Sequence, residues 1–341
     1  MAAVLLWDGI TSGAVYALLA MAIVLVFSVT RVIFLQQGEF VAFGALTLAM
    51  LQQGQVPGTV WLLLALAGVA AAMDVLAALR AQRTVWNAAG SAARQLVLPV
   101  SVSLLAAWLA PMRAPLIVQA LLTLALVTPL GSLTYRIAYR SLANASVLLL
   151  LIVSVGVHFA LSGLALAFFG AEGFQTPSFW DLRLSLGALT INGQALVVFF
   201  VTVAIVIGLF LFFEKTLTGK ALRATAVNRK GARLMGISSD LAGSLSFTLA
   251  SFIGALSGLL IGPTMTMFYD SGFLIGLKGF VAAVFAGLAS FPGALAGAVM
   301  LGVLEAFGSF WASAFKEVIV FTAILPVLLW RSLTDSHLGE H

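Results

Sequence analysis

Six ionisable or amide side chains are candidates for function within the apolar segments of this 341-residue chain: Gln36, Gln37, Glu39, His158, Lys278 and Glu305. A charged or amide group in hydrocarbon is costly unless it has a polar partner or faces a water-filled path. These residues therefore predict either buried polar contacts between helices or the lining of a path through a membrane. For Glu305 we favour a hydrogen bond to a neighbouring helix, and we interpret His158 as a packing histidine.

Two of these groups occur in similar strings. Glu39 lies in QGEFVA at 37–42, and Lys278 lies in LKGFVA at 277–282. The similarity predicts an internal repeat that brings Glu39 and Lys278 to a central path, where they would form an ion pair. The alternative is a chance match over a few residues.

A second cluster of polar residues is the basic segment 217–239, between apolar segments at 194–213 and 241–263. Its helix-forming residues and flanking glycines predict a short helix along the membrane surface, within a cytoplasmic coupling loop at 214–240. On one helix, Leu222, Ala226 and Arg229 would share a face. The predicted docking residues for a soluble partner are Arg223, Asn228, Arg229, Lys230, Arg233, Met235 and Gly236. The alternative is that these charges only fix the topology of the chain.

Catalytic and metal-binding patterns are missing from the sequence. It contains no GxxxxGK[ST] phosphate loop, no HExxH and no GxSxG string, and it has no cysteine. The three histidines, at 158, 337 and 341, are too dispersed for a metal cluster. We therefore expect a protein that is not an enzyme, has no cofactor or metal, and cannot hydrolyse ATP by itself through such a loop.

The elements that position these residues are membrane helices. The chain is 62% hydrophobic and only 9% charged, far from the composition of a soluble domain. Apolar runs of membrane-spanning length predict an all-α, polytopic transmembrane bundle with ten or eleven spans. We place them at 9–29, 37–51, 57–79, 95–110, 115–135, 145–169, 194–213, 241–263, 273–291, 293–310 and 315–331. The second span, 37–51, is short. The ninth and tenth, 273–291 and 293–310, are separated only by a turn at 291–293. The second, and either the ninth or the tenth, are therefore candidates for re-entrant half-helices.

The basic residues set the expected orientation. With the N-terminus outside and eleven alternating spans, 13 of the 17 Lys and Arg residues fall in inner loops. The pI near 9.9 arises from these loops, so it does not indicate nucleic-acid binding. The longest outer segment, 170–193, is either a plain connector or a surface that receives an external partner. Glycines at 254, 258, 293, 297 and 302 predict helices whose backbones approach closely.

Several strings resemble one family, the branched-chain amino acid ABC transporter permeases of the LivH type. The basic segment resembles the family's coupling helix. Further matches, in the family's order, are DGITSGAVYAL at 8–18, GEF at 38–40, GFLIGLKGF at 272–280, FPGALAG at 291–297, GVLEAFG at 302–308 and FKE at 315–317. The resemblance extends over more than half of the chain.

The chain departs from the family's pattern at two places. Gln37 stands where members commonly carry a histidine before Gly-Glu, which removes a titratable group and leaves the transported solute open. Residues 74–114 are additional and predict an inserted hairpin outside the core bundle.

The resemblance implies the membrane-spanning permease subunit of an ABC importer in the bacterial inner membrane, for branched-chain amino acids or related small organic solutes. It implies four kinds of partner: cytosolic ABC ATPase subunits, a second related permease, a periplasmic solute-binding protein and membrane lipid. The alternatives are an ion-coupled secondary transporter of a small polar solute, which needs no ATPase, and a membrane scaffold without a path. Dependence of function on both the basic segment and the intramembrane polar residues would favour the permease.

Overall fold

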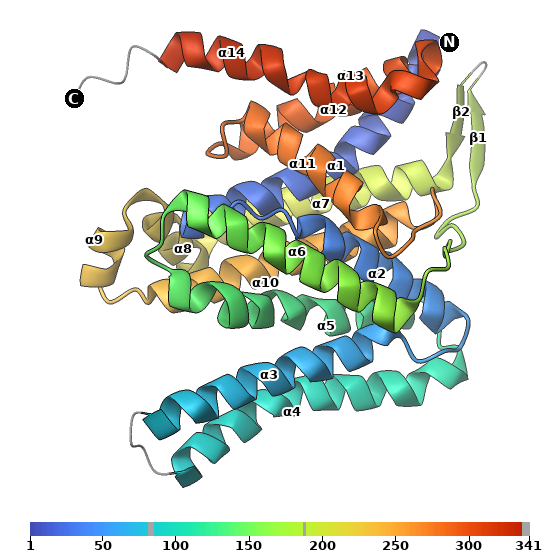
Figure 1. Cartoon of the computed structure of the whole chain (residues 1–341). Coiled ribbons are helices and arrows are strands. Elements are labelled where there is room, and N and C mark those ends of the chain that lie inside the picture. The colour runs from blue at the N-terminus through green and yellow to red at the C-terminus, as the bar shows by residue number, and fades with distance from the viewer. Residues whose placement is uncertain (81–84, 187–188, 336–341) are drawn as a thin grey trace.

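The computed structural model describes residues 1–80, 85–186 and 189–335, and Figure 1 shows them as a bundle of helices with one small β-hairpin. Arg83, His337 and His341 lie outside the described residues. The main helices are α1 (Ala2–Thr30), α2 (Gln37–Gln52), α3 (Gly58–Arg80), α4 (Val85–Leu109), α5 (Leu116–Thr134), α6 (Val147–Phe169), α7 (Gly193–Lys215), α8 (Leu217–Val227), α9 (Arg229–Leu234), α10 (Ser239–Ile261), α11 (Ser271–Phe285), α12 (Phe291–Trp311), α13 (Lys316–Thr322) and α14 (Ile324–Asp335).

The prediction of a polytopic helical membrane protein is confirmed, but the number of long spans differs. Within the described ranges, eight helices are long and apolar enough to cross a membrane. The predicted spans at 37–51 and 273–291 form shorter helices, α2 and α11, of 16 and 15 residues. At 1.5 Å per residue these reach only about 24 Å and 22 Å, less than the roughly 30 Å of a hydrocarbon core.

Two predicted boundaries near the C-terminus are also wrong. The predicted span at 315–331 is built as two helices, α13 and α14, separated by a turn at Ala323. The predicted turn at 291–293 is the first turn of α12, where Pro292 is tolerated because the first amide groups of a helix have no partner within it. The chain instead reverses at 286–290, with left-handed backbone at Gly287 and Leu288.

The core is built around α1, which is apolar on all sides and packs against α7, α10, α11 and α12. Its residues Ala17, Leu18 and Leu19 have no exposed surface. A helix without a polar face suits this position because every side meets another helix. Glycines predicted to allow close approach do so: a Cβ on Gly258 would collide with the Val41 carbonyl, and one on Gly302 with that of Gly9.

Six of the helices form two groups of three, and the contacts within one group correspond to those within the other. In one triplet, α1 contacts α11 and α12, and in the other, α10 contacts α2 and α5. The α2–α5 contact matches the α11–α12 contact, while α1 meets α10 and α2 meets α11 at the centre. Two related repeats could pack in this way, but these contacts do not test the internal repeat expected from the sequence, which stays a prediction.

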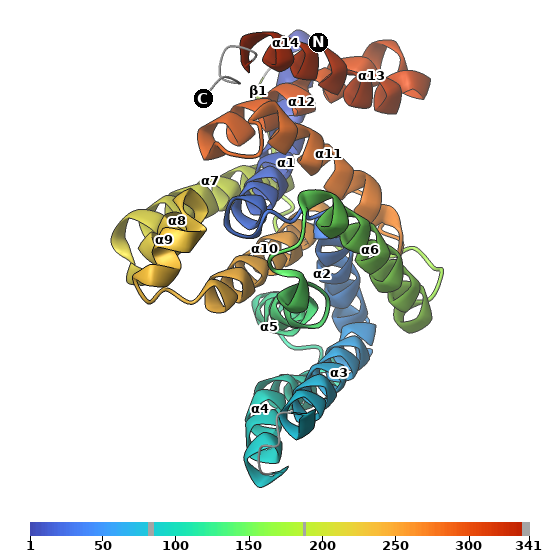
Figure 2. The same cartoon turned by 60° about the vertical axis from the view of Figure 1, so that its left-hand side comes forward.

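The helices α3 and α4 lie side by side at the edge of the bundle in both views (Figures 1 and 2). The end of α3 is tied to the core by Asp74, which pairs with Arg136 and lies 3.9 Å from Arg140. Arg140 also pairs with Asp240 of α10 at 3.1 Å. The span predicted at 115–135 continues further, because Arg136 and Arg140 lie in a helical extension of α5, a π turn at Tyr135–Tyr139 followed by a 3₁₀ turn at Arg140–Leu142. That residues 74–114 are an insertion stays a prediction.

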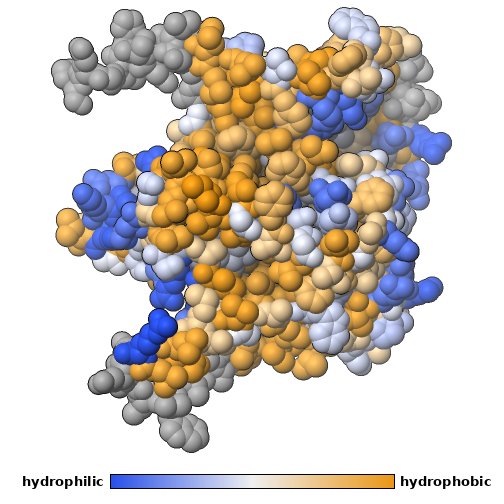
Figure 3. Space-filling model, viewed as in Figure 1, coloured by the Kyte–Doolittle hydropathy of each residue, from blue (hydrophilic) through white to orange (hydrophobic). Residues whose placement is uncertain are grey.

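The segment 170–193 is more ordered than a plain connector. It contains an antiparallel hairpin of β1 (Arg183–Leu186) and β2 (Leu189–Asn192), with Arg183 opposite Asn192. A further bridge joins Phe174 to Met267, in the loop after α10. We call this the hairpin end of the bundle and the opposite end, which holds α8 and α9, the basic end. On the face in Figure 3, apolar side chains cover the middle, and hydrophilic ones gather toward these two ends.

Candidate functional site

The N-terminal turns of α2 and α11 cross at two glycines, Gly38 and Gly272. Each is the second residue of its helix, and a Cβ on either one would collide with the backbone carbonyl of the other. The two backbones therefore touch, with no side chain between them. The crossing brings Gly38 against Gly272, and it does not bring Glu39 and Lys278 together.

Beside this crossing lies the Glu39 cluster, formed by Gln36, Gln37, Glu39 and His158. The first three side chains have no exposed surface, and His158 is 8% exposed. Gln36 donates to the Tyr139 hydroxyl at 2.6 Å, and Gln37 donates to the Ala250 carbonyl at 3.0 Å. His158 Nδ1 lies 2.9 Å from Glu39 Oε1. His158 also packs on Phe273 of α11, with ring centroids 4.6 Å apart.

Several acceptors in this cluster have no hydrogen-bond partner among the residues that the structure describes. They are Oε1 of Gln36, Oε1 of Gln37 and both carboxylate oxygens of Glu39. Of the described residues, His158 is the one whose ring nitrogen lies within ion-pair distance of Glu39 Oε1. Buried acceptors are normally satisfied, and a cluster of orphans inside a bundle indicates a place where water or a polar solute binds.

A second group of charges surrounds a cavity at the hairpin end, which we call the polar cavity. Lys278 Nζ lies 2.6 Å from Glu305 Oε1 and 3.1 Å from Glu317 Oε1. The Tyr16 hydroxyl donates to Glu305 Oε2 at 2.5 Å, and the Lys278 ammonium lies 5.8 Å from the centre of the Tyr16 ring. Four helices, α1, α11, α12 and α13, thus meet in one charged network.

The polar cavity has a volume of about 420 Å³. Charges of both signs line it, from Lys278 and Lys316 on one hand and Glu305 and Glu317 on the other. Its remaining lining combines hydroxyl side chains, from Thr11, Ser12, Thr264, Ser271 and Tyr16, with an apolar wall from Val15, Val198, Leu260, Ile261, Met265, Leu274 and Ile275. A cavity of this size with a few charged groups and an apolar wall suits a small ligand that carries both charges and hydrocarbon.

The coupling segment, residues 214–240, forms two helices rather than the single one expected. The Thr216 hydroxyl caps α8 by accepting from Gly219 N at 2.9 Å. Asn228 ends α8 and caps α9, its side chain accepting from Gly231 N at 2.9 Å. Asn228 has extended backbone and its side-chain oxygen caps the next helix, so α8 and α9 are separate helices. The single helix face predicted to hold Leu222, Ala226 and Arg229 is therefore interrupted at Asn228.

The basic residues of this segment differ in their surroundings. Arg229 is half-buried and donates to the Ala143 carbonyl at 2.8 Å, and burial lowers the pKa of its guanidinium. Arg233 donates to Ser239 at 2.7 Å, and Arg223 pairs with Glu214 at 2.9 Å. Lys230 is exposed. Arg229 and Arg233 therefore hold the segment against the bundle, which sequence reasoning did not foresee.

The tip of the coupling segment exposes apolar side chains to an unusual degree. Val227, Leu234 and Met235 are 83%, 88% and 82% exposed. Gly236 follows in a left-handed conformation with φ 82° and open space around it. We call Val227, Lys230, Leu234 and Met235 the docking tip. It lies at the basic end, where Figure 1 shows α8 and α9 at the edge of the bundle.

The predicted pathway residues thus fall into two groups rather than one. Gln36, Gln37 and Glu39 lie together, while Lys278 and Glu305 form the other group, and the expected Glu39–Lys278 ion pair is wrong because each has a nearer partner. The expected hydrogen bond of Glu305 to a neighbouring helix is confirmed. Sequence reasoning missed Tyr16 and Glu317, although both lie in the strings 8–18 and 315–317 that carried the family resemblance. No group of three potential metal ligands occurs among the residues described.

Comparison with known proteins gives the same family as the resemblance found in the sequence. The family model described as "Branched-chain amino acid transport system / permease component" matches residues 5–330. The permease protein BraD of the high-affinity branched-chain amino acid transport system of Pseudomonas aeruginosa is 32% identical over 203 residues, which are 58% of this chain and 66% of that protein. Escherichia coli LivH is 31% identical over 57% of this chain and 65% of its own length.

A more distant relative, a probable LivH of Methanocaldococcus jannaschii, is 29% identical over 61% of this chain and 70% of its length. The alignments with BraD and E. coli LivH span just under two thirds of those proteins. The family and these relatives are transport permeases, not enzymes.

Proposed function

Because this chain belongs to the family of branched-chain amino acid transport permease components, we propose that it is the membrane-spanning permease subunit of an ABC importer. It forms half of a translocation path for branched-chain amino acids or related small organic solutes. The other half comes from a second related permease, cytosolic ABC ATPases drive the cycle, and a periplasmic solute-binding protein delivers the solute. The site of action is the bacterial inner membrane.

The observation that carries the proposal is the docking tip. Three large apolar side chains there are more than four-fifths exposed, on short capped helices held to the bundle by Arg229 and Arg233. Exposed apolar side chains beside a cation on an ordered scaffold are typical of a surface that a protein covers. An ATPase that binds here would move α8 and α9, and α8 packs directly on α1, α7 and α10.

The polar cavity supports the solute class. A branched-chain amino acid carries one ammonium, one carboxylate and an apolar side chain. Lys278 or Lys316 would bind the carboxylate, Glu317 the ammonium, and Ile261, Leu274 and Ile275 the hydrocarbon. The apolar wall also explains why a cavity with such charges does not require a highly charged solute.

The proposal is tested by co-purification of the tagged chain with the ATPase from its native membrane. We expect Lys230→Glu/Met235→Glu to reduce ATPase recovery about tenfold or more, because it places two negative charges on the docking tip. The control is Arg183→Glu/Trp180→Glu, which changes exposed residues at the hairpin end and should leave recovery unchanged. Equal recovery with wild-type and the docking-tip variant would contradict the proposed coupling.

A second prediction concerns Glu39. Glu39→Gln replaces a fully buried carboxylate by a neutral amide whose oxygen can still accept from His158, so we expect the melting temperature to stay unchanged or rise. If the Glu39 cluster lines the path, ATP-driven uptake of leucine in proteoliposomes containing the whole transporter should nevertheless fall. A lower melting temperature with normal uptake would instead assign Glu39 a purely structural role.

The ion-coupled alternative makes a different prediction in the same vesicles. It requires leucine uptake driven by a proton or sodium gradient with no ATPase present. Such uptake, lost in Glu39→Gln, would replace the importer by a secondary transporter. Uptake that needs both ATP and an intact docking tip would exclude it.

A further inference from the structure

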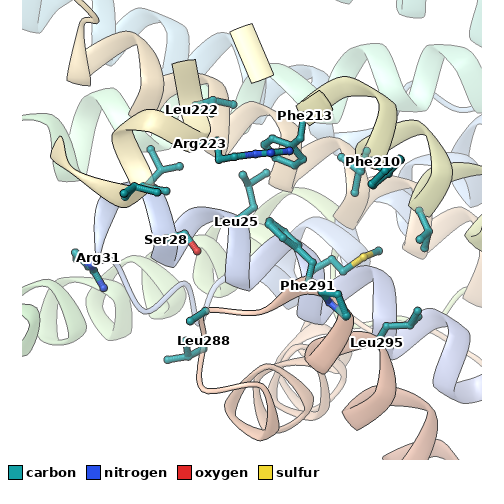
Figure 4. Close-up of a pocket in the computed structure, with 18 residues that line it drawn as sticks. Leu25, Ser28, Arg31, Phe210, Phe213, Leu222, Arg223, Leu288, Phe291 and Leu295 are labelled. Atoms are coloured by element: carbon teal, nitrogen blue, oxygen red, sulfur yellow. The ribbon is translucent and has the colours of Figure 1, made fainter. Parts of the chain in front are cut away.

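A second cavity lies at the basic end, and the proposed transport path does not use it. Its volume is about 610 Å³, and we call it the apolar cavity. Its walls come from the last turns of α1, from α7, from α8 and from the turn that leads into α12. Figure 4 shows Leu25, Phe210, Phe213, Leu222, Phe291 and Leu295 around it.

The lining combines an apolar interior with two cations. Apart from Ser28, whose hydroxyl donates to its own helix at the Val24 carbonyl, the polar side chains of the lining are Arg31 and Arg223. Arg31 ends α1 in a left-handed conformation with φ 62°, and its side chain is exposed. Arg223 projects from α8 on another wall (Figure 4).

The charge balance at the mouth is positive. Arg223 uses one of its nitrogens to pair with Glu214, and a guanidinium has further N–H donors left. Lys215 and Lys220 flank the turn between α7 and α8. A ligand that suits this cavity therefore has an anionic group near the two arginines and an apolar group in the interior.

The cavity is continuous with a face of α7 that meets hydrocarbon in a membrane. On that helix Phe200, Ile207, Phe210 and Leu211 are 62%, 53%, 63% and 47% exposed, and Phe210 also lines the cavity. A lipid chain can reach the interior sideways from the bilayer. Among the described residues that line the cavity, a polar solute finds only the two arginines and the Ser28 hydroxyl as polar side chains.

We propose that the apolar cavity binds one anionic phospholipid, with an acyl chain among Leu25, Phe213 and Leu295 and its anionic headgroup at the side of the cavity that carries Arg31 and Arg223. Basic pockets between membrane helices at the leaflet surface recognise acidic headgroups in this way. The volume is within the range of sites for small ligands. Because α8 forms one wall, the bound lipid would also hold the coupling segment at a fixed distance from α12.

The test measures lipid retained by the purified full chain, so it does not depend on transport or on any ATPase. The chain is extracted in mild detergent with equal amounts of phosphatidylglycerol and phosphatidylcholine of the same chain length, and bound lipid is counted by native mass spectrometry. We expect wild-type to retain phosphatidylglycerol in preference. Arg31→Asn should lower that preference about fivefold, since one cation near the headgroup is lost.

Two further variants make the result specific. Arg113→Asn is a matched control, because Arg113 also ends a helical turn in left-handed backbone, with φ 47°, and asparagine tolerates that conformation at both sites. It should retain phosphatidylglycerol as wild-type does. Ser28→Phe fills the cavity from α1 and should abolish retention there. Unchanged retention in both Arg31→Asn and Ser28→Phe would overturn the proposal.

A labelling experiment covers the case in which a variant fails to fold. Wild-type protein in vesicles that contain phosphatidylglycerol with a diazirine near the end of one acyl chain is irradiated and digested. Labelled peptides from the ends of α1 and α7 and from the start of α12 would support the site, and label confined to other helices would overturn it. Loss of this label on binding a protein partner would also overturn it, because the cavity would then be a protein interface.

Discussion

Gly38→Ala is expected to destabilise the protein by about 3 kcal/mol or more, the upper part of the range for overpacked sites. The new Cβ would collide with the carbonyl oxygen of Gly272, and the Cα of Gly276 also lies next to it. A side-chain clash can be relieved by a change of rotamer, but here the obstacle is backbone. The collision is relieved only if α2 and α11 move apart, and this would open the contact between the two triplets of helices at the centre of the bundle.

The measurement is the melting temperature of the detergent-purified protein, with a decrease of roughly 5–10 °C expected. Gly68→Ala is the matched control, because Gly68 is also helical and a Cβ there meets nothing within 4 Å. The control should match wild-type, since alanine favours a helix. A normal melting temperature for Gly38→Ala would mean that the crossing of α2 and α11 is looser than the structure shows.

The membrane class and most of the helices were predictable because hydropathy over a window of about 20 residues depends on composition alone. The two short helices were expected only as candidates for half-helices, and their contact with each other was not predictable. The strings at 37–51 and 273–291 are apolar, and only the glycine crossing, a contact between residues 38 and 272, reveals that they meet end to end inside the bundle. The division of the coupling segment was missed because Asn228 is compatible with a helix interior until its side chain caps the next turn.

The candidate site could be predicted as a set of residues but not as a set of pairs. The cost of a charge in hydrocarbon is a local property, so Glu39, Lys278 and Glu305 stood out from the sequence. Their partners depend on which helices are neighbours. Glu317 stands at the start of α13, where a carboxylate looks solvated in the sequence, yet the fold places it 3.1 Å from Lys278. Tyr16 gave no signal, because a tyrosine in an apolar helix is unremarkable until a carboxylate faces it.

The largest effect at the polar cavity is expected for Lys278→Met, which leaves Glu305 without its cation. The side chain of Lys278 is 9% exposed and that of Glu305 is 14% exposed, so water replaces the lost partner poorly. Removing one member of a buried pair costs about 3–5 kcal/mol, because the other charge stays buried and unpaired. The Tyr16 hydroxyl still donates to Glu305, but a neutral donor does not neutralise the carboxylate. We expect a melting temperature well below that of wild-type.

The double variant Lys278→Met/Glu305→Gln separates structure from transport. It removes both charges of the pair, so most of the stability should return, because replacing both members of a buried pair is often close to neutral. Glu317 loses its cation as well, but its side chain is 38% exposed and can be hydrated. If the polar cavity binds the solute through Lys278, leucine uptake by the assembled transporter stays low in the stable double variant. Recovery of uptake together with the melting temperature would show that the pair only holds α11 to α12.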